Sequence, residues 1–132
     1  MINSSIAFVL VRLAIAASMF GHGLVRLPKL PAFSNWMTGN FQNSMLPHAL
    51  VLPFSYALPV AEFAIGLLLL LGLFTQQVLI AGAIVMVVLI FGSSMIEEWS
   101  AIPSQLIHVL FFAFLLSNIH LNTFSVDKLI HK

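Results

Sequence analysis

The chain has 132 residues, of which 61% are hydrophobic and only 7% are charged, with a formal net charge of +1 at pH 7. Soluble domains carry about 25% charged residues, so this composition excludes an ordinary soluble domain, and the small net charge indicates no nucleic-acid partner. Cysteine is absent, which excludes a disulfide, an iron–sulfur cluster and thiol chemistry within the chain.

Four apolar runs are long enough to cross a hydrocarbon core, which takes about 20 helical residues. They cover residues 5–25, 54–74, 78–97 and 103–119. The first run carries an arginine inside it and leads to no small-residue cleavage site, so a signal peptide is not expected. Because backbone polar groups in lipid must be satisfied within the protein, we predict an all-α integral membrane four-helix bundle, formed by residues 1–132 as one domain.

An even number of spans places both termini on the same side of the membrane. We expect a multi-pass protein of a bacterial plasma membrane with both termini in the cytoplasm, although the lysines and arginines divide evenly between the two sides. Lys128 and Lys132 of the C-terminal tail are expected to meet lipid headgroups.

The long connection between the first two spans covers residues 26–53. Within it the sequence PAFSNWMTGNF sets Phe33, Trp36, Met37 and Phe41 at helical spacing. The pattern is typical of an interfacial helix lying on the bilayer, and it fits an ordered loop that caps the bundle equally well.

Two ionisable residues of opposite charge lie inside the first two spans. Arg12 is expected about 10 Å below the terminus-side surface and Glu62 about 12 Å below the other surface, at 1.5 Å per residue. In a core about 30 Å thick their backbones would then differ in depth by about 8 Å, which extended side chains can bridge. Ionisable groups at such depth face the bundle interior and pair, so we predict an ion pair between Arg12 and Glu62. The pair either fixes the bundle or forms the floor of a ligand site.

Polar side chains also gather near the loop-side surface of the predicted bundle. His22 lies near the end of the first span and His108 near the start of the fourth, both within about 6–8 Å of that surface. With Arg26 and Gln105 they are predicted to rim a polar pocket, although each histidine also fits an ordinary interhelical hydrogen bond. No HExxH or CxxC spacing occurs, so no metal site is predicted.

The stretch GHGLVRLPKL after an intramembrane arginine, followed by LPVAEFAIGLLLLLGLFTQ in the second span, resembles the DoxX-like family. These are small four-helix membrane proteins related to the membrane subunit of thiosulfate:quinone oxidoreductase. The resemblance covers about residues 5–120. Carried over residue by residue, it marks the family-pattern positions Arg12, Gly21, Gly23, Lys29, Glu62 and Gly66. It implies a subunit that works with a redox partner, while the lack of cysteine and of a partner domain puts thiosulfate oxidation itself in doubt.

Two functions of different classes fit this sequence. The first is the membrane subunit of a quinone-linked redox complex, with a soluble or membrane partner subunit, a quinone in the polar pocket and no other cofactor in the chain. The second is a non-enzymatic membrane scaffold or chaperone-like partner protein. A small transporter fits less well, because no inverted repeat is recognisable. The sequence identifies no catalytic residue and leaves a homo-oligomer open.

Overall fold

The computed structural model describes residues 2–130, and within this range every regular element is a helix. The elements in chain order are α1 (Ile2–Arg26), the 3₁₀ turn η1 (Leu27–Lys29), α2 (Leu30–Asn40), α3 (His48–Leu71), α4 (Thr75–Met95), η2 (Trp99–Ala101), α5 (Ile102–Ser117), η3 (Ile119–Leu121) and α6 (Val126–Ile130). Four helical segments are long and apolar enough to cross a membrane, namely Ile2–Asn40, His48–Leu71, Thr75–Met95 and Trp99–Ser117. The predicted fold class is confirmed.

The second span begins earlier than predicted. The sequence placed its start after Pro53, whereas α3 begins at His48, directly after Pro47 with its extended backbone. Pro53 and Pro59 both lie inside the helix. A proline in a helix interior removes one backbone hydrogen bond, but α3 continues through both prolines to Leu71. Lys132 lies outside the described residues, and Lys128 is exposed.

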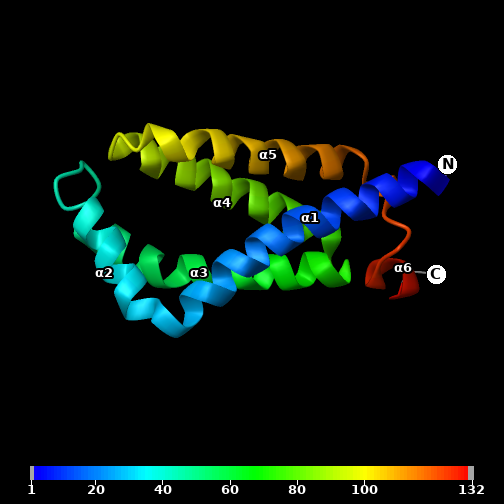
Figure 1. Ribbon diagram of the computed structural model, residues 1–132, viewed down its shortest axis with the longest axis horizontal. Coiled ribbons are helices and arrows are strands. Elements are labelled where there is room, and N and C mark those ends of the chain that lie inside the picture. Colours follow the sequence, from blue (N-terminus) through cyan, green and yellow to red (C-terminus); the bar gives the residue numbers. More distant parts are fainter. Residues whose placement is uncertain (1, 131–132) are drawn as a thin grey trace.

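The connection between the first two spans contains a helix that is packed on the bundle. Pro28 and Pro31 follow α1 closely, and the chain passes through η1 before it continues as α2. Helix α2 buries Ser34 and Met37, and the Ser34 hydroxyl lies 2.7 Å from the Ser55 hydroxyl of α3. The predicted interfacial segment is therefore helical, and it lies against α3 at one end of the bundle (Figure 1).

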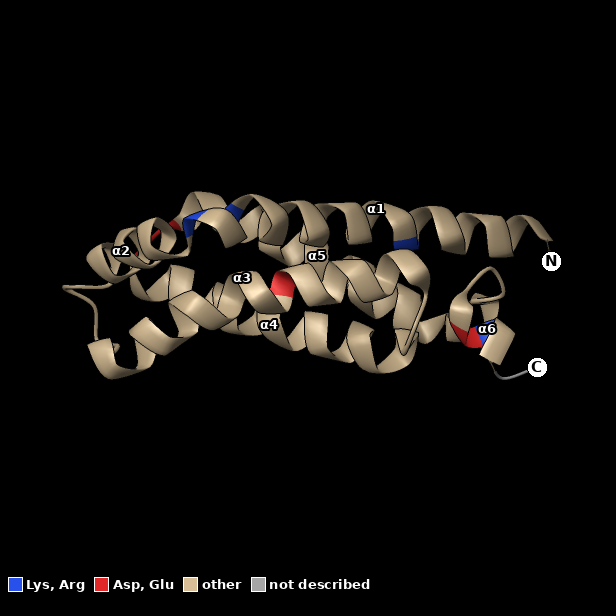
Figure 2. Ribbon diagram, turned by 90° about the horizontal axis from the view of Figure 1, so that it is seen from below, with Lys and Arg blue, Asp and Glu red and all other residues tan. Residues whose placement is uncertain are grey.

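The spans form two antiparallel pairs, α1 with α3 and α4 with α5 (Figure 1). The described ends of the chain both lie at the end of the bundle opposite α2. This agrees with the expectation that the two termini are on the same side of the membrane. Charged residues are few and lie mainly at the α2 end and in α6, with isolated positions along α1 and α3 (Figure 2). The main apolar core includes the buried side chains of Phe8, Ile15, Met19, Leu69, Leu79, Phe112 and Leu115.

Two glycines fix how α1 and α3 lie against each other. A Cβ atom at Gly23 would meet the backbone of Phe63, and one at Gly66 would meet the backbone of Phe20. The rings of Phe20 and Phe63 pack beside these contacts with centroids 5.0 Å apart. Small residues of this kind let two transmembrane helices approach closely. The two contacts therefore set the register of the antiparallel pair.

Gly66→Ala is expected to destabilise the bundle, because the added methyl group would have to displace the backbone of Phe20. Gly21→Ala is the matched control, since no atom lies within 4 Å of a Cβ at that position. Both exchanges gain the same helix propensity, about 1 kcal/mol, while overpacking costs about 1–3 kcal/mol. In denaturing-detergent titrations Gly66→Ala should unfold earlier than Gly21→Ala. Equal midpoints for the two variants would show that this contact does not set the packing.

Candidate functional site

A partly buried ion pair joins the end of α1 to the middle of α3. The Arg26 Nη1 atom donates a hydrogen bond to Glu62 Oε1 at 2.8 Å. The Glu62 side chain is 4% exposed and that of Arg26 is 30% exposed, so the carboxylate lies inside the bundle and the guanidinium reaches it from the edge. The guanidinium carbon also lies 4.5 Å from the centre of the Phe33 ring, a cation–π contact that holds Arg26 from the α2 side.

The predicted ion pair between Arg12 and Glu62 is wrong, although both residues are buried as expected. The register explains the error. With Gly23 facing Phe63 and Gly66 facing Phe20, Glu62 lies level with the last turns of α1, near Arg26. Arg12 lies twelve residues further along the pair, level with the α3–α4 turn, which corresponds to about 18 Å at 1.5 Å per residue. Counting depth from the start of each apolar run assumes that α1 and α3 begin and end at the same levels in the membrane. In the structure the beginning of α1 extends past the end of α3 (Figure 1), so the predicted depths do not hold.

Arg12 instead holds the C-terminal segment against the bundle. Its Nη1 atom donates to Asn122 Oδ1 and to the Phe124 carbonyl oxygen, each at 2.9 Å. Asn122 in turn donates from Nδ2 to Thr75 Oγ1 at 3.0 Å. The segment from η3 to α6 is therefore tied to both α1 and the start of α4.

Asp127 completes this attachment at the N-terminus of α4. Its two carboxylate oxygens accept hydrogen bonds from the backbone N–H groups of Phe74 and Thr75, both at 2.8 Å. Its own N–H donates to the carbonyl oxygen of Gly72 at 3.0 Å. A carboxylate at a helix N-terminus satisfies unpaired backbone donors and interacts favourably with the helix dipole. The sequence did not suggest this attachment, because Asn122 and Asp127 lie outside any periodic pattern.

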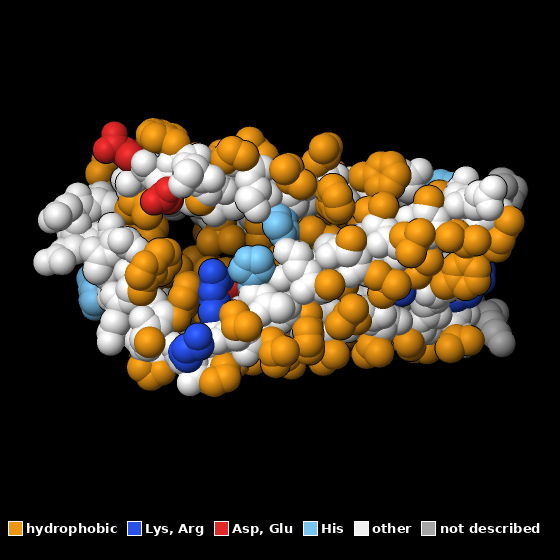
Figure 3. Space-filling view, in the orientation of Figure 1, with side chains coloured by type: hydrophobic (Ala, Val, Ile, Leu, Met, Phe, Trp, Pro, Cys, Tyr) orange, Lys and Arg blue, Asp and Glu red, His pale blue; other side chains and the backbone are white. Residues whose placement is uncertain are grey.

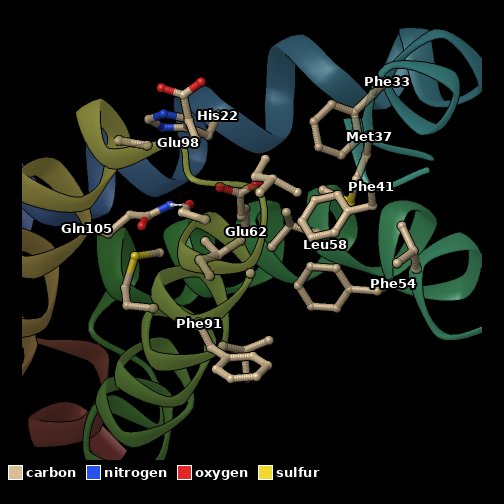
Figure 4. A pocket seen from close by; sticks show the side chains of 18 of the residues that line it. His22, Phe33, Met37, Phe41, Phe54, Leu58, Glu62, Phe91, Glu98 and Gln105 are labelled. Atoms are coloured by element: carbon tan, nitrogen blue, oxygen red, sulfur yellow. Dashed lines mark hydrogen bonds between the residues drawn. The ribbon is translucent and has the colours of Figure 1, made fainter. Parts of the chain in front are cut away.

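A cleft of about 550 Å³ opens between the two helix pairs near α2. Figure 3 shows the hollow, with basic, acidic and histidine side chains around it. At one end of the cleft the lining is polar and includes His22, Arg26, Glu62, Ser93, Gln105 and His108. Toward the other end it is apolar and includes Phe33, Met37, Phe41, Phe54 and Leu58, which lie beside Glu62 on the side away from Gln105 (Figure 4).

The four residues predicted to rim a pocket, His22, Arg26, Gln105 and His108, all line this cleft. The two histidine rings lie edge to face with centroids 6.3 Å apart. His108 Nδ1 lies 2.7 Å from the Ser104 carbonyl oxygen and its Nε2 lies 2.8 Å from Ser18 Oγ. A carbonyl oxygen only accepts, so Nδ1 carries the proton and Nε2 accepts from Ser18. This bond joins α5 to α1 beside the cleft.

His22 has one ring nitrogen bonded within its own helix. Its Nδ1 atom lies 2.6 Å from the carbonyl oxygen of Ser18, so Nδ1 carries the proton and Nε2 of the neutral ring is an acceptor. Gln105 donates from Nε2 to Ser93 Oγ at 3.0 Å. Its Oε1 atom is buried and has no hydrogen-bond partner among the described residues.

The remaining family-pattern positions divide by location. Gly23 and Gly66 form close α1–α3 contacts. A Cβ atom at Gly21 would meet no atom within 4 Å, and Lys29 is exposed at the end of η1. Neither Gly21 nor Lys29 lines the cleft.

Part of the cleft wall was not predicted from the sequence. Three of its apolar side chains come from α2 and the residue that follows it, namely Phe33 and Met37 of the helix and Phe41 at its C-cap. Their four-residue spacing indicated one face of a helix, and that face is turned to the cleft.

The comparisons with known proteins give one match. The family model described as DoxX matches residues 7–94, which include Arg26, Glu62, Gly23 and Gly66 but not the α5 residues Gln105 and His108. No curated protein and no solved structure matches the chain. The match and the four apolar helices identify a multi-pass membrane protein.

Arg12→Met is expected to release the C-terminal segment while leaving the cleft intact. It removes both hydrogen bonds from Arg12 to the segment, and a hydrogen bond to a charged group contributes about 1.5–3 kcal/mol. Amide hydrogen exchange of residues 119–130 should then accelerate about tenfold or more. Arg26→Met is the control and should leave this exchange unchanged. Unchanged protection in Arg12→Met, or equal loss in both variants, would contradict the attachment.

Proposed function

Since the chain belongs to the DoxX family, we propose that it is the membrane subunit of a quinone-linked redox complex and that its cleft receives the ring of a quinone-type carrier. The size and the lining of the cleft are the main support for this proposal. Small-molecule sites are concave, about 300–1,000 Å³ in volume, and mostly apolar with a few polar groups. The cleft has this size, an apolar aromatic end and a polar end.

The lining suits a flat ring that carries oxygen atoms. Phe33, Phe41 and Phe54 offer aromatic surfaces for stacking. The polar end, with Glu62 and Gln105, would face the ring oxygens (Figure 4). A bound quinone would itself supply the redox chemistry, so the chain's contribution is to position the ring and to keep water away from it.

A partner subunit belongs to the same proposal. Because the chain contains no cysteine, it cannot provide an iron–sulfur cluster or a redox-active thiol to exchange electrons with the ring. In this proposal a second protein exchanges electrons with the ring. A scaffold without ligand is the competing function, and binding measurements separate the two.

Leu58→Trp is expected to abolish quinone binding by filling the apolar end of the cleft. Leu58 is 3% exposed and lines the cleft, whereas Leu67 on the same helix is 39% exposed, so Leu67→Trp is the matched control. In mild detergent, isothermal titration with decylbenzoquinone should show saturable binding for the unaltered chain and for Leu67→Trp. For Leu58→Trp the affinity for decylbenzoquinone should fall by about tenfold or more, because the larger side chain fills part of the cleft and crowds the residues around it.

Failure of the unaltered chain to bind decylbenzoquinone would refute this function. If a stoichiometric partner protein then co-purifies and the lipid extract holds no quinone, the scaffold function is the one supported.

A further inference from the structure

The cleft has an apolar opening in addition to its polar end. Leu50 of α3 and Val88 and Phe91 of α4 all line the cleft, yet these residues are 63%, 44% and 55% exposed. A residue that lines a cleft and is also largely exposed lies at its rim. Phe91 lies on the opposite side of Glu62 from His22 (Figure 4). The cleft therefore opens between α3 and α4 as well as at its polar end, and we call this second mouth the α3–α4 opening.

The depth of the α3–α4 opening places it in the hydrocarbon region of the membrane. Helix α4 has 21 residues, about 32 Å at 1.5 Å per residue, which matches a hydrocarbon core about 30 Å thick. Phe91 and Val88 lie four and seven residues before Met95, the last residue of the helix. They are thus about 6 and 10 Å inside that end of the span, at the level of lipid acyl chains.

Direct contacts close the neighbouring sides of the cleft. A Cβ atom at Gly92 would lie 3.3 Å from the ring of Phe41, so Phe41 packs on α4 at the α2 end. Beside the cleft a hydrogen bond between Ser18 and His108 joins α1 to α5. A chain that leaves through the α3–α4 opening meets lipid at once, whereas one that leaves at the polar end has to pass the charged and histidine side chains there.

The size of the cleft limits how much of a ligand it can enclose. Its volume of about 550 Å³ is that of a site for one small molecule, so a ring and a chain long enough to cross a membrane leaflet do not both fit inside. Lipid tails are as apolar as a leucine side chain, so an apolar chain that stays in the bilayer loses nothing when its ring binds. Exposure of the same chain to water would be unfavourable.

We propose that the ligand of the cleft is a ring with a long apolar chain, and that this chain leaves through the α3–α4 opening into the bilayer. Leu50 and Val88 are the rim residues that determine whether such a chain is accepted. This inference rests on the proposed function that a quinone-type ring enters the cleft, and it adds the path of the chain. The ligand then enters sideways from the bilayer and not from water.

Val88→Trp tests the path by narrowing the α3–α4 opening. Val87→Trp is the matched control, because Val87 is exposed on the same helix and does not line the cleft. Binding to the purified protein in mild detergent is measured by equilibrium dialysis with decylbenzoquinone and with methylbenzoquinone, which has the same ring without the long chain. The two probes are used at equal concentrations within the micelles, so their different partition into detergent does not affect the comparison.

The unaltered chain should bind both probes with similar affinity on this scale. Val88→Trp should weaken the binding of decylbenzoquinone by about tenfold or more, because the larger side chain occupies the path of the decyl group. It should leave methylbenzoquinone within about twofold, and Val87→Trp should change neither affinity. Leu50→Trp, at the other side of the opening, should repeat the result, with the exposed Leu52, outside the cleft lining, as the site of its control Leu52→Trp. If Val88→Trp does not fold, this second pair of variants carries the test.

The outcomes separate the two proposals. Binding of neither probe by the unaltered chain refutes the proposed function, and the path of the chain with it. Unchanged binding of decylbenzoquinone in Val88→Trp and Leu50→Trp, or an equal loss for both probes, refutes the path while the proposed function stands. Binding of decylbenzoquinone alone by the unaltered chain would show that the protein holds the decyl group, and would also overturn the path into the bilayer.

Discussion

The structure of the site depends on the ion pair between Arg26 and Glu62. A charged side chain inside a transmembrane helix costs about 2.5–3.5 kcal/mol on insertion scales, so Glu62 requires a partner. Arg26 provides it at 2.8 Å from a position that is partly exposed. The pair holds the end of α1 to α3 at the level where the cleft opens, and it supplies the charged side of the polar lining. The family match covers both residues.

The register between α1 and α3 assigns different tasks to two arginines of the same helix. Arg12 and Arg26 lie on one stripe of α1, and the glycine contacts determine what each one meets on the neighbouring elements. Arg26 comes level with Glu62 and faces the cleft. Arg12 comes level with the α3–α4 turn and binds Asn122 and Phe124 of the C-terminal segment. One end of the bundle is thus closed by hydrogen bonds, and the other is left open as a cleft.

Much of this arrangement follows from local patterns in the sequence. The apolar runs predicted the four spans, and helical spacing placed Arg12, Glu62, Gly23 and Gly66 on buried faces, as observed. Depth within the spans brought His22 and His108 to the same pocket. The partner of Glu62 could not be predicted in this way, because the register of two helices depends on contacts such as that of Gly66 with Phe20, which periodicity does not reveal. The C-terminal attachment was missed for a related reason, since the short polar segment around Asn122 has no repeat to indicate what it contacts.

A double-mutant cycle tests the central ion pair most directly. The free energy of unfolding in detergent would be measured for Glu62→Gln, Arg26→Met and their combination, and in parallel for Glu62→Gln with Arg12→Met. Residues in contact show a coupling energy of about 0.5–3 kcal/mol, and distant ones add within about 0.5 kcal/mol. We expect coupling of Glu62 with Arg26 and simple additivity with Arg12. Additivity with Arg26, or coupling to Arg12 of the same size, would contradict the structure of the site described above.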